Sequence, residues 1–343
     1  MRITHSMMTR NYMSSVNKNL KNLTNSNDRL SSQRAFNKAS EDVSGAARAL
    51  RVRRLLRENE QAVTTIKDLS ATYEAAEDSL MAINNIVGTI TEDLVRGMSG
   101  TMDVQDREKL AREVENLQEH VLQTMNAKFS DKFLFGASGN ADGSAPFTVG
   151  ADGALSYNGQ AVDAMGADAS GKPLVAPGGA PIAFNKPNYV DIGLGFELTG
   201  TGMDASADPR TAVVNNFSGV EAFGFGVDAD GNPKNVYSLL GKVAADLRVG
   251  NSSTLSTDLD AVKAMHSALL TQVTDMGNRS DFIEQTSARL ENDILNLQEV
   301  QNRVEAVPLE QEMMYNKDFE MSWMVTLQLG SKILPPSIFN FLQ

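Results

Sequence analysis

Apolar residues recur at alternating steps of three and four along two long stretches of the chain. The first stretch places Val52, Leu55, Asn59, Ala62, Ile66, Leu69, Tyr73, Ala76, Leu80, Ile83, Val87, Ile90 and Leu94 at these steps. The second repeats the spacing from Leu255 to Val304. This spacing puts one apolar stripe along a helix and is typical of coiled-coil packing. It predicts two long helices, about 65 and 75 Å in length at 1.5 Å per residue.

A shorter helix is predicted between them. It starts near Asp103 and carries Leu110, Val114, Leu117 and Val121 at heptad spacing. Gly97 and Gly100 end the first long helix, and the short gap favours an antiparallel hairpin. The second long helix has polar residues on its stripe, which tend to fix register: His266, Ser280, Ser287 and Gln301.

The middle of the chain has a different composition. Residues 136–231 hold 18 of the 26 glycines, and short apolar runs such as APFTVG, GALSYNG, PIAF, YVDIGLGFEL and VEAFGFGV alternate with turn residues. These runs predict short β-strands. Aromatic residues are available for a small core: Phe147, Tyr157, Phe184, Phe196, Phe217, Phe223 and Phe225. The predicted fold is mainly α, a heptad-patterned bundle built from both chain ends with a small β-rich inserted outer domain.

Both tails carry apolar stripes that cannot be buried within the tail itself. In residues 321–343, twelve of 23 side chains are Met, Trp, Val, Leu, Ile or Phe, and only Lys332 is charged. Because termini fray unless something covers them, we expect each tail to pack against the other or against another chain. The predicted assembly interface is Met13, Val16, Leu20, Leu23, Leu30, Trp323, Met324, Leu327, Ile338, Phe339, Phe341 and Leu342.

The charge and composition narrow the function. A net charge of −12 argues against nucleic-acid binding, since a phosphate backbone favours a basic partner. The absence of cysteine excludes disulfides and thiolate chemistry. The N-terminus has no apolar run of signal-peptide length, so a cleaved leader is not expected. Pro335 and Pro336 interrupt the apolar C-terminus, which is therefore not expected to span a membrane.

No catalytic, cofactor or metal site is predicted. His5, His120 and His266 lie in different segments, and no His, Asp or Glu cluster has ligand spacing. The sequence GFGVDADGN (224–232) is interpreted as a β-turn, because it lacks the terminal Glu of a calcium loop. An alternative function of a different class is that the insert carries an enzyme or a metal-binding module. A further alternative is nucleic-acid binding through the basic run 48–57. The preferred interpretation of this run is a solvated helix face or a contact with a neighbour's acidic patch.

Several motifs resemble the flagellin superfamily. RLSSQRAFNKASEDVSGAARALRVRR (29–54) is similar to its N-terminal signature. The opening MRIT, DKFLFGAS (131–138), GNRSDFIEQTSARLE (277–291) and ILPPSIFNFLQ (333–343) resemble, within it, the hook–filament junction family of hook-associated protein 3. Flagellin itself is the alternative. Gln33 stands where the family usually has glycine, so a tight left-handed turn is less favoured there.

The resemblance implies a structural role outside the cell. Residues 1–36 and 305–343 would form an inner domain that is disordered until assembly, residues 37–135 and 239–304 the helical bundle, and residues 136–238 the variable outer domain. The implied partners are hook-associated protein 1, flagellin, further copies of the chain in a ring, and an export chaperone, with no nucleic acid, membrane or cofactor. The implied route out of the cell is the flagellar type III export apparatus.

Overall fold

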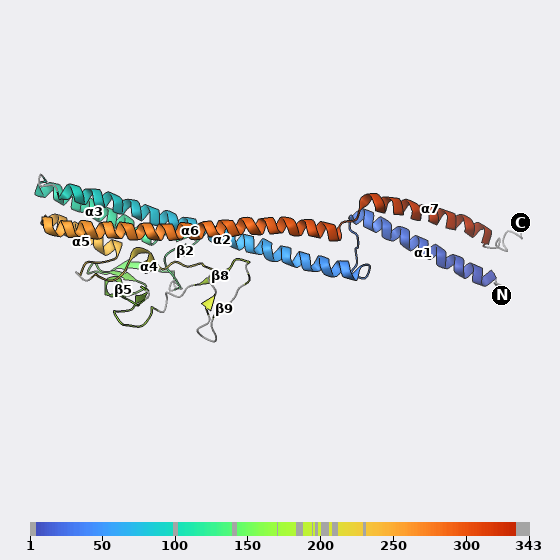
Figure 1. The fold of residues 1–343 in the computed structure, drawn as a ribbon, viewed down its shortest axis with the longest axis horizontal. Helices are drawn as coiled ribbons and strands as arrows, with labels where there is room; N and C mark the ends of the chain where they lie inside the picture. Colours follow the sequence, from blue (N-terminus) through green and yellow to red (C-terminus); the bar gives the residue numbers. More distant parts are fainter. Residues whose placement is uncertain are drawn as a thin grey trace. The chain divides into compact units, whose positions relative to one another are not determined.

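The computed structural model describes residues 5–98, 102–138, 143–169, 171–182, 188–193, 195, 198–199, 206–207, 212–228 and 231–333. Most of these residues are helical (Figure 1). The helices are α1 (His5–Ser32), α2 (Val43–Gly97), α3 (Val104–Met125), α4 (Gly219–Phe223), α5 (Val236–Val249), α6 (Ser252–Glu305) and α7 (Leu309–Ile333), and a 3-10 turn, η1, covers Val162–Ala164.

The strands lie between α3 and α4 and are short. They are β1 (Lys128–Phe129), β2 (Lys132–Phe133), β3 (Phe147–Val149), β4 (Leu155–Tyr157), β5 (Gln160–Ala161), β6 (Gly166–Ala167), β7 (Pro173–Leu174), β8 (Tyr189–Asp191), β9 (Leu198–Thr199), β10 (Ser206–Ala207) and β11 (Ala212–Val214). All pairings are antiparallel: β1 with β2, β3 with β4 and β4 with β5, β6 with β7, β8 with β11, and β9 with β10. The predicted fold class, mainly α with a small β-rich insert, is confirmed.

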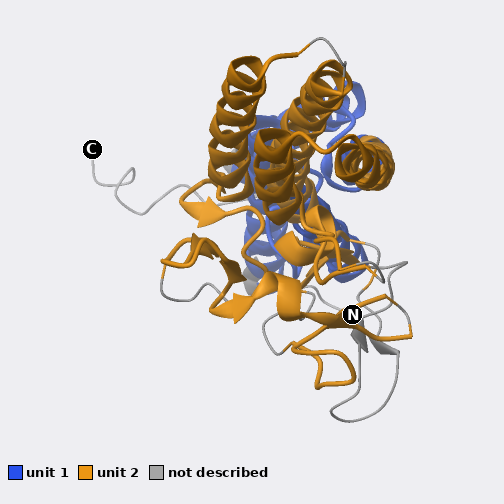
Figure 2. Cartoon of the chain, turned by 90° about the vertical axis from the view of Figure 1, so that its left-hand side faces the viewer, with its two compact units in different colours: residues 1–60, 291–343 blue, residues 61–290 orange. Residues whose placement is uncertain are grey.

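The chain divides into two compact units (Figure 2). Unit 1 contains residues 1–60 and 291–343, and unit 2 contains residues 61–290. Unit 1 therefore combines the two ends of the chain, whereas unit 2 is one continuous stretch.

The helices of unit 2 share one apolar core. The predicted stripe of α2 is fully buried from Tyr73 to Leu94. Side chains of α3, α5 and α6 are buried in the same unit, among them Val114, Val121, Leu240, Val243, Leu247, Val262, Leu269 and Ile283. α2 and α6 meet through side chains: a Cβ built on Gly277 would lie 3.6 Å from Glu77 Oε1, and one on Gly88 would lie 4.0 Å from His266 Nε2. The seam expected from heptad spacing is thus present.

The helix ends follow local sequence signals. Asp103 caps α3, where its carboxylate accepts a hydrogen bond from the Val104 N–H at 2.6 Å. α2 ends at Gly97, as predicted. α5 ends at Gly250, whose φ of 72° is the left-handed conformation that suits glycine after a helix. One predicted stripe position is wrong: Leu56 is 6% exposed and Leu55 is 38% exposed, so the seam shifts by one residue there.

A buried ion pair links α5 to α6. The Lys242 ammonium donates to the carboxylate of Asp258, a side chain that is fully buried in the bundle, and to Asp246 at 2.8 Å. Burial raises the pKa of Asp258, and the lysine opposes that shift. Lys242 thereby stabilises a carboxylate that would otherwise be costly to bury.

Aromatic side chains hold the insert against the bundle within unit 2. The Tyr73 hydroxyl of α2 donates to the Val214 carbonyl at 2.7 Å, and its ring packs edge-on against Phe217 with centroids 4.8 Å apart. Phe135 packs against Phe223, and Phe147 packs against Tyr157, at centroid distances of 4.7 and 4.8 Å. The insert is therefore packed against the bundle within unit 2.

Two predictions for the insert do not match the described structure directly. The run VEAFGFGV was expected to be a strand, but its first half is α4. Ser218 caps this helix, with its hydroxyl accepting a hydrogen bond from the Glu221 N–H, and Glu221 follows it at capping-box spacing. Phe184 and Phe196 lie outside the described residues, and Phe225 is half-buried.

We predict that Ile83→Ala destabilises the protein by about 2–5 kcal/mol, because Ile83 is fully buried in the seam and its truncation leaves a cavity. Met81, two residues away on the same helix, is 47% exposed, so Met81→Ala should change stability by less than about 0.5 kcal/mol. Urea unfolding followed by circular dichroism measures both. Equal losses in the two variants would contradict the observed seam.

Candidate assembly site on the terminal helices

Within unit 1, the two terminal helices α1 and α7 pack along each other (Figure 1). α7 begins directly after Pro308, a residue that lacks a backbone N–H and suits a helix start. Glu310 and Glu312 lie in its first turn, where carboxylates complement the positive end of the helix dipole. These signals fix the position at which α7 starts.

The contact between α1 and α7 includes a series of polar side chains. Near the start of α7, Arg29 donates to Glu312 Oε1 from both Nε, at 2.9 Å, and a terminal guanidinium nitrogen, at 2.6 Å. One turn further on, Asn316 Nδ2 donates to Asn27 Oδ1 at 2.8 Å and to Ser26 Oγ at 3.3 Å. Ser26 is fully buried and Glu312 is 7% exposed. These polar side chains therefore occupy positions where a helix pair usually has apolar residues.

The polar contacts continue toward the chain ends. Asn19 Nδ2 donates to Thr326 Oγ1 at 2.7 Å, and Thr326 is buried. At Gly330, a Cβ would lie 2.0 Å from the Tyr12 hydroxyl, so glycine lets the tyrosine ring approach the α7 backbone. Directional hydrogen bonds and this close approach together select one register for the two helices.

The outer faces of the same helices are apolar. The exposed large apolar side chains are Met7, Met8, Met13 and Leu20 on α1, and Leu309, Met313, Met314, Tyr315, Met321, Met324, Val325, Leu327 and Leu329 on α7. Large apolar side chains left exposed in this number, interspersed with polar residues, indicate a protein interaction site. Methionine is common in such surfaces because its flexible side chain adapts to a partner.

The structure places the predicted interface residues in three groups. Val16, Leu23, Leu30 and Trp323 are half-buried. Met13, Leu20, Met324 and Leu327 are exposed. Ile338, Phe339, Phe341 and Leu342 lie outside the described residues. We expected the two tails to bury their apolar stripes against each other; they do pack together, but much of the apolar surface faces outward.

Sequence reasoning missed the polar contacts. Asn19 and Ser26 are seven residues apart, and Glu312 and Thr326 are fourteen apart, so each pair shares one heptad position. A polar repeat at heptad spacing inside an apolar tail was the signal that could have identified them. Apolar spacing alone does not reveal it.

A short joint connects the terminal helices to the rest of unit 1. The Ala35 N–H donates to the Glu305 carbonyl at 2.8 Å, and the Val307 N–H donates to the Gln33 carbonyl at 3.1 Å. Gln33 has a φ of 57°, so the left-handed turn is present although glycine is absent. The expectation that glycine's absence disfavours this turn is therefore wrong. The paired backbones of residues 33–35 and 305–307 hold it in place.

An ion pair braces the joint. Arg53 donates to both carboxylate oxygens of Glu305, with Nε at 2.6 Å from Oε1, and Gln301 Nε2 donates to Oε1 at 3.3 Å. These hydrogen bonds, those from Arg53 first, lower the pKa of Glu305 below its ordinary value of 4.5. The carboxylate is nearly buried and Arg53 is 39% exposed, so water screens part of the attraction.

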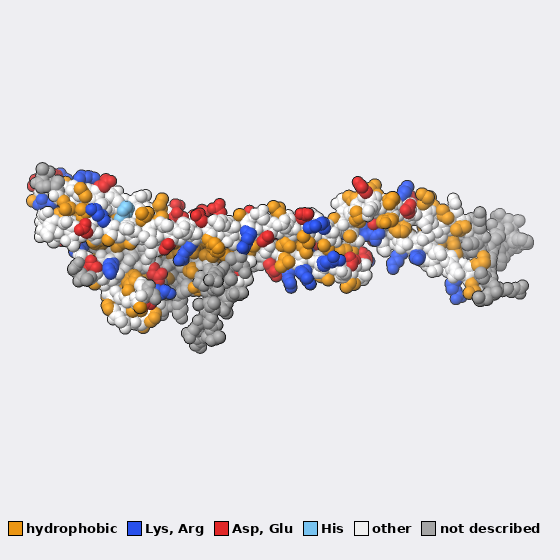
Figure 3. Space-filling model, in the orientation of Figure 1, with side chains coloured by type: hydrophobic (Ala, Val, Ile, Leu, Met, Phe, Trp, Pro, Cys, Tyr) orange, Lys and Arg blue, Asp and Glu red, His pale blue; other side chains and the backbone are white. Residues whose placement is uncertain are grey.

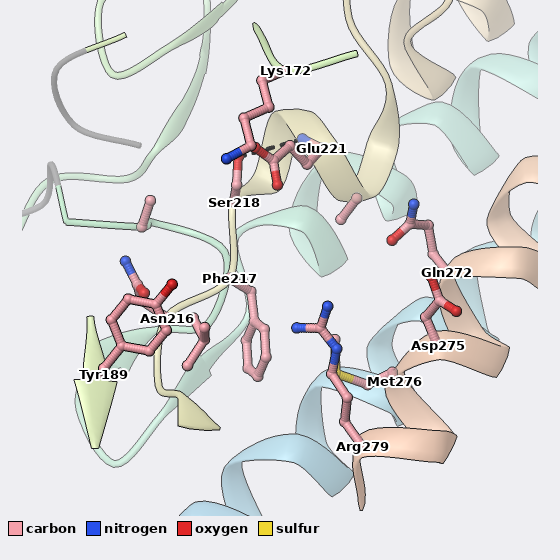
Figure 4. A pocket seen from close by; sticks show the side chains of 13 residues that line it. Lys172, Tyr189, Asn216, Phe217, Ser218, Glu221, Gln272, Asp275, Met276 and Arg279 are labelled. Carbon is pink, nitrogen blue, oxygen red and sulfur yellow. Dashed lines mark hydrogen bonds between the residues drawn. The ribbon is translucent and has the colours of Figure 1, made fainter. Parts of the chain in front are cut away.

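Unit 2 contains a cavity of about 300 Å³ between the insert and α6. Figure 4 shows Gln272 and Arg279 of α6 on one side and Tyr189 and Glu221 of the insert on the other. Ser218 also lines it, but its hydroxyl caps α4. The described residues give this cavity no nucleophile paired with a base, and nowhere do they form a His, Asp or Glu group that could hold a metal ion. No helix in the described part of the chain is long and apolar enough to cross a membrane.

Comparison with known proteins gives a match for the N-terminal part of the chain. Residues 3–140 match the sequence model of the bacterial flagellin N-terminal helical region. The resemblance to the flagellin superfamily is thus confirmed for these residues. A search of curated protein sequences finds no match.

Solved structures show a similar fold. A protein of Vibrio parahaemolyticus assigned as a flagellar hook-associated protein is 16% identical, with a TM-score of 0.56, over 78% of this chain and 100% of that one. FlgL of Bacillus cereus is 14% identical, with a TM-score of 0.50, over 74% of this chain and 99% of that one. A hook-associated protein-3 of Legionella pneumophila has a lower TM-score of 0.48, with 12% identity over 74% of this chain and 98% of that one. The first two similarities establish the fold alone.

The Arg53–Glu305 pair predicts a pH dependence of the joint. Because the folded pKa of Glu305 lies below its ordinary value of 4.5, its stabilisation is present above that pH and is lost as the pH falls through the lowered pKa. We expect Glu305→Gln to weaken the joint by about 1 kcal/mol at neutral pH and by progressively less below pH 4.5. Amide hydrogen exchange at Ala35 and Val307 measures the opening.

Glu299→Gln is the control, because Glu299 lies on the same helix and makes only an exposed contact with Arg303 at 3.9 Å. It should leave the exchange of both amides unchanged at every pH. If Glu305→Gln weakens the joint by the same amount at every pH down to 2, the charge of the carboxylate does not stabilise the joint.

Proposed function

We propose that this chain, whose N-terminal part is a flagellin N-terminal helical region, is a non-catalytic structural subunit that joins the hook of the bacterial flagellum to its filament. The observation that carries the proposal is the terminal helix pair, which meets through polar contacts and presents apolar side chains outward. A pair built this way lacks a cover for its apolar faces, and neighbouring subunits of a polymer would supply one.

The energetics favour assembly through these faces. Burying a Leu, Met or Val side chain contributes about 1.5–3 kcal/mol. Twelve such side chains are exposed on α1 and α7 together, beside Tyr315. If each gains half of its full burial, they contribute about 9–18 kcal/mol, which is enough to offset an association cost of about 4–15 kcal/mol. The predicted interface residues Met13, Leu20, Met324 and Leu327 belong to this set.

The finer parts of the proposal come from the sequence motifs. The subunit would contact hook-associated protein 1 on the hook side, flagellin on the filament side, and further copies of itself in a ring. It would leave the cell through the flagellar type III export apparatus with the help of a chaperone and function outside the cell. That residues 1–36 and 305–343 order only on assembly stays a prediction, with residues 37–135 and 239–304 as the bundle and 136–238 as the outer domain.

Flagellin, the bulk filament subunit, is the second candidate. The fold similarity is to hook-associated proteins, and the MRIT and DKFLFGAS motifs also favour the junction role. Abundance separates the two roles, because a filament subunit dominates sheared appendages and a junction subunit is scarce in them.

Deletion of the gene in its flagellated host tests the function. We expect cells that retain hooks, lack filaments and release flagellin into the medium. Cells that still bear filaments would contradict the junction role, and loss of the major protein of sheared appendages would identify flagellin.

We also predict that the double substitution Met324→Ser and Leu327→Ser, tested by complementing the deletion strain, prevents filament attachment. Both side chains are about half exposed in the subunit, so together they account for about 3 kcal/mol in the polymer, a roughly 100-fold weaker association. Stability of the purified subunit should change little. The matched control replaces two exposed polar residues of α7, Gln311→Ser and Asp318→Ser, and should retain filaments. Attachment at the wild-type level in the Met324 and Leu327 variant would remove these residues from the interface.

A further inference from the structure

Charge is divided unevenly along the chain. Residues 1–60 carry twelve basic and five acidic side chains, a net charge of +7. Residues 61–290 carry sixteen basic and thirty acidic side chains, a net charge of −14. A protein that is acidic as a whole thus contains a distinctly basic N-terminal segment.

The basic segment includes four arginines on the N-terminal part of α2, named here the arginine stripe: Arg48, Arg51, Arg54 and Arg57. They follow one another at steps of three residues, so the row winds gradually around the helix. All four side chains are exposed. Figure 3 shows Lys and Arg side chains gathered over this part of α2. Among the described residues, the only ion pair of the stripe joins Arg54 to Glu58, at 3.7 Å between two exposed side chains. Arg48 donates to the Ser44 hydroxyl and Arg57 to the Arg53 carbonyl, contacts that leave their charges uncompensated.

An acidic band lies in unit 2, where α2 and α6 run together. It consists of Glu74, Glu77 and Asp78 on α2 and Asp281 on α6. Glu77 Oε1 is 3.6 Å from the position of a Cβ at Gly277, which is one helical turn from Asp281. Arg279 lies on the same stretch of α6, beside the Tyr73 hydroxyl. Like charges at spacings of three and four residues destabilise a helix, so the stripe and the band each favour an oppositely charged partner.

The two surfaces cannot compensate each other along α2. Seventeen residues separate Arg57 from Glu74 in this helix, and only side chains three or four residues apart meet on a helix surface. Arginine is also well suited to binding an acidic surface, because its planar guanidinium binds carboxylates in a bidentate manner. The stripe lacks the interleaved aromatic residues that stack on nucleic-acid bases.

We infer that the arginine stripe of one copy of this chain binds the acidic band of the next copy. The inference rests on the proposed role as a subunit of a polymer. Because the two surfaces are different, the contact is heterologous: each copy uses its stripe on one neighbour and its band on the other, which produces a ring or a helix rather than a two-fold dimer.

A charge-exchange experiment with full-length protein tests this contact. One variant reverses the stripe (R48E/R51E/R54E/R57E), and the other reverses the band (E74K/E77K/D78K/D281K). Alone, each variant has two surfaces of the same sign and should not associate through them. Mixed, the stripe of each variant faces a band of opposite sign on the other, so both contacts are restored. Circular dichroism verifies that each variant is folded.

Two readouts are used. In a deletion host, each variant alone should give less than a tenth of the wild-type number of filaments, and co-expression should restore at least half. In sedimentation of the purified proteins at low salt, the mixture should form larger species that dissociate as salt is raised, and neither variant alone should do so. The control variant K109E/R112E/K263E/R289E has the same net charge as the stripe variant and reverses exposed basic residues elsewhere. Expressed alone, the control variant should give the wild-type number of filaments. Co-expression with the band variant should not raise that number.

Other outcomes overturn the inference. Wild-type filaments with the stripe variant alone would mean that the stripe is a solvated face. Failure of the mixture to restore filaments, with both variants folded and exported, would assign the stripe to another partner, such as flagellin or an acidic polymer. If deletion of the gene itself leaves filaments intact, the proposed junction role fails instead, and the sedimentation of the mixture still decides the contact between copies.

Discussion

The seam between α2 and α6 is the constraint on which the rest of unit 2 depends. These helices come from distant parts of the chain, and their buried stripes are complementary only when the segment between them has been closed into a loop. The entropy cost of closure grows slowly with loop length, about 0.6 kcal/mol for each doubling. A bundle built this way can therefore carry a large insert at little extra cost. Tyr73 shows how the insert is then attached, since it occupies a seam position of α2 and bonds to the insert backbone.

The periodic parts of the fold could be predicted from the sequence. Heptad spacing identified α2, α3 and α6 because each helix buries one continuous stripe, and turn residues identified β3 and β4. The failures occur where a local interaction overrides the pattern. Leu56 replaces Leu55 in the seam, because two adjacent leucines cannot be distinguished by spacing alone. The Ser218 cap turns an apparent strand into α4. Gln33 adopts a left-handed conformation because the paired backbones of the joint hold it there.

The sequence predicted where the candidate site lies, but it predicted only part of the contacts that form it. Apolar composition pointed to both tails, and half-buried Val16 and Trp323 agree with a pair of helices in contact. The polar contacts that set the register could not be derived from apolar spacing, because Arg29 and Glu312 look like ordinary surface residues until the two ends of the chain are brought together. A sequence shows which residues share one helix face, but it does not show which distant face lies opposite.

The hydrogen bond between Asn19 and Thr326 joins residues that are 307 positions apart. A ribosome adds about 5–20 residues per second, so α1 is synthesised roughly 15–60 s before the residues of α7 exist. During this interval the N-terminal segment has no intramolecular partner for its polar or its apolar face, and a helix with a thin stripe is marginal alone. The two ends consequently cannot pair until the chain is nearly complete. Any factor that binds the nascent N-terminal segment therefore acts before α7 can compete for it.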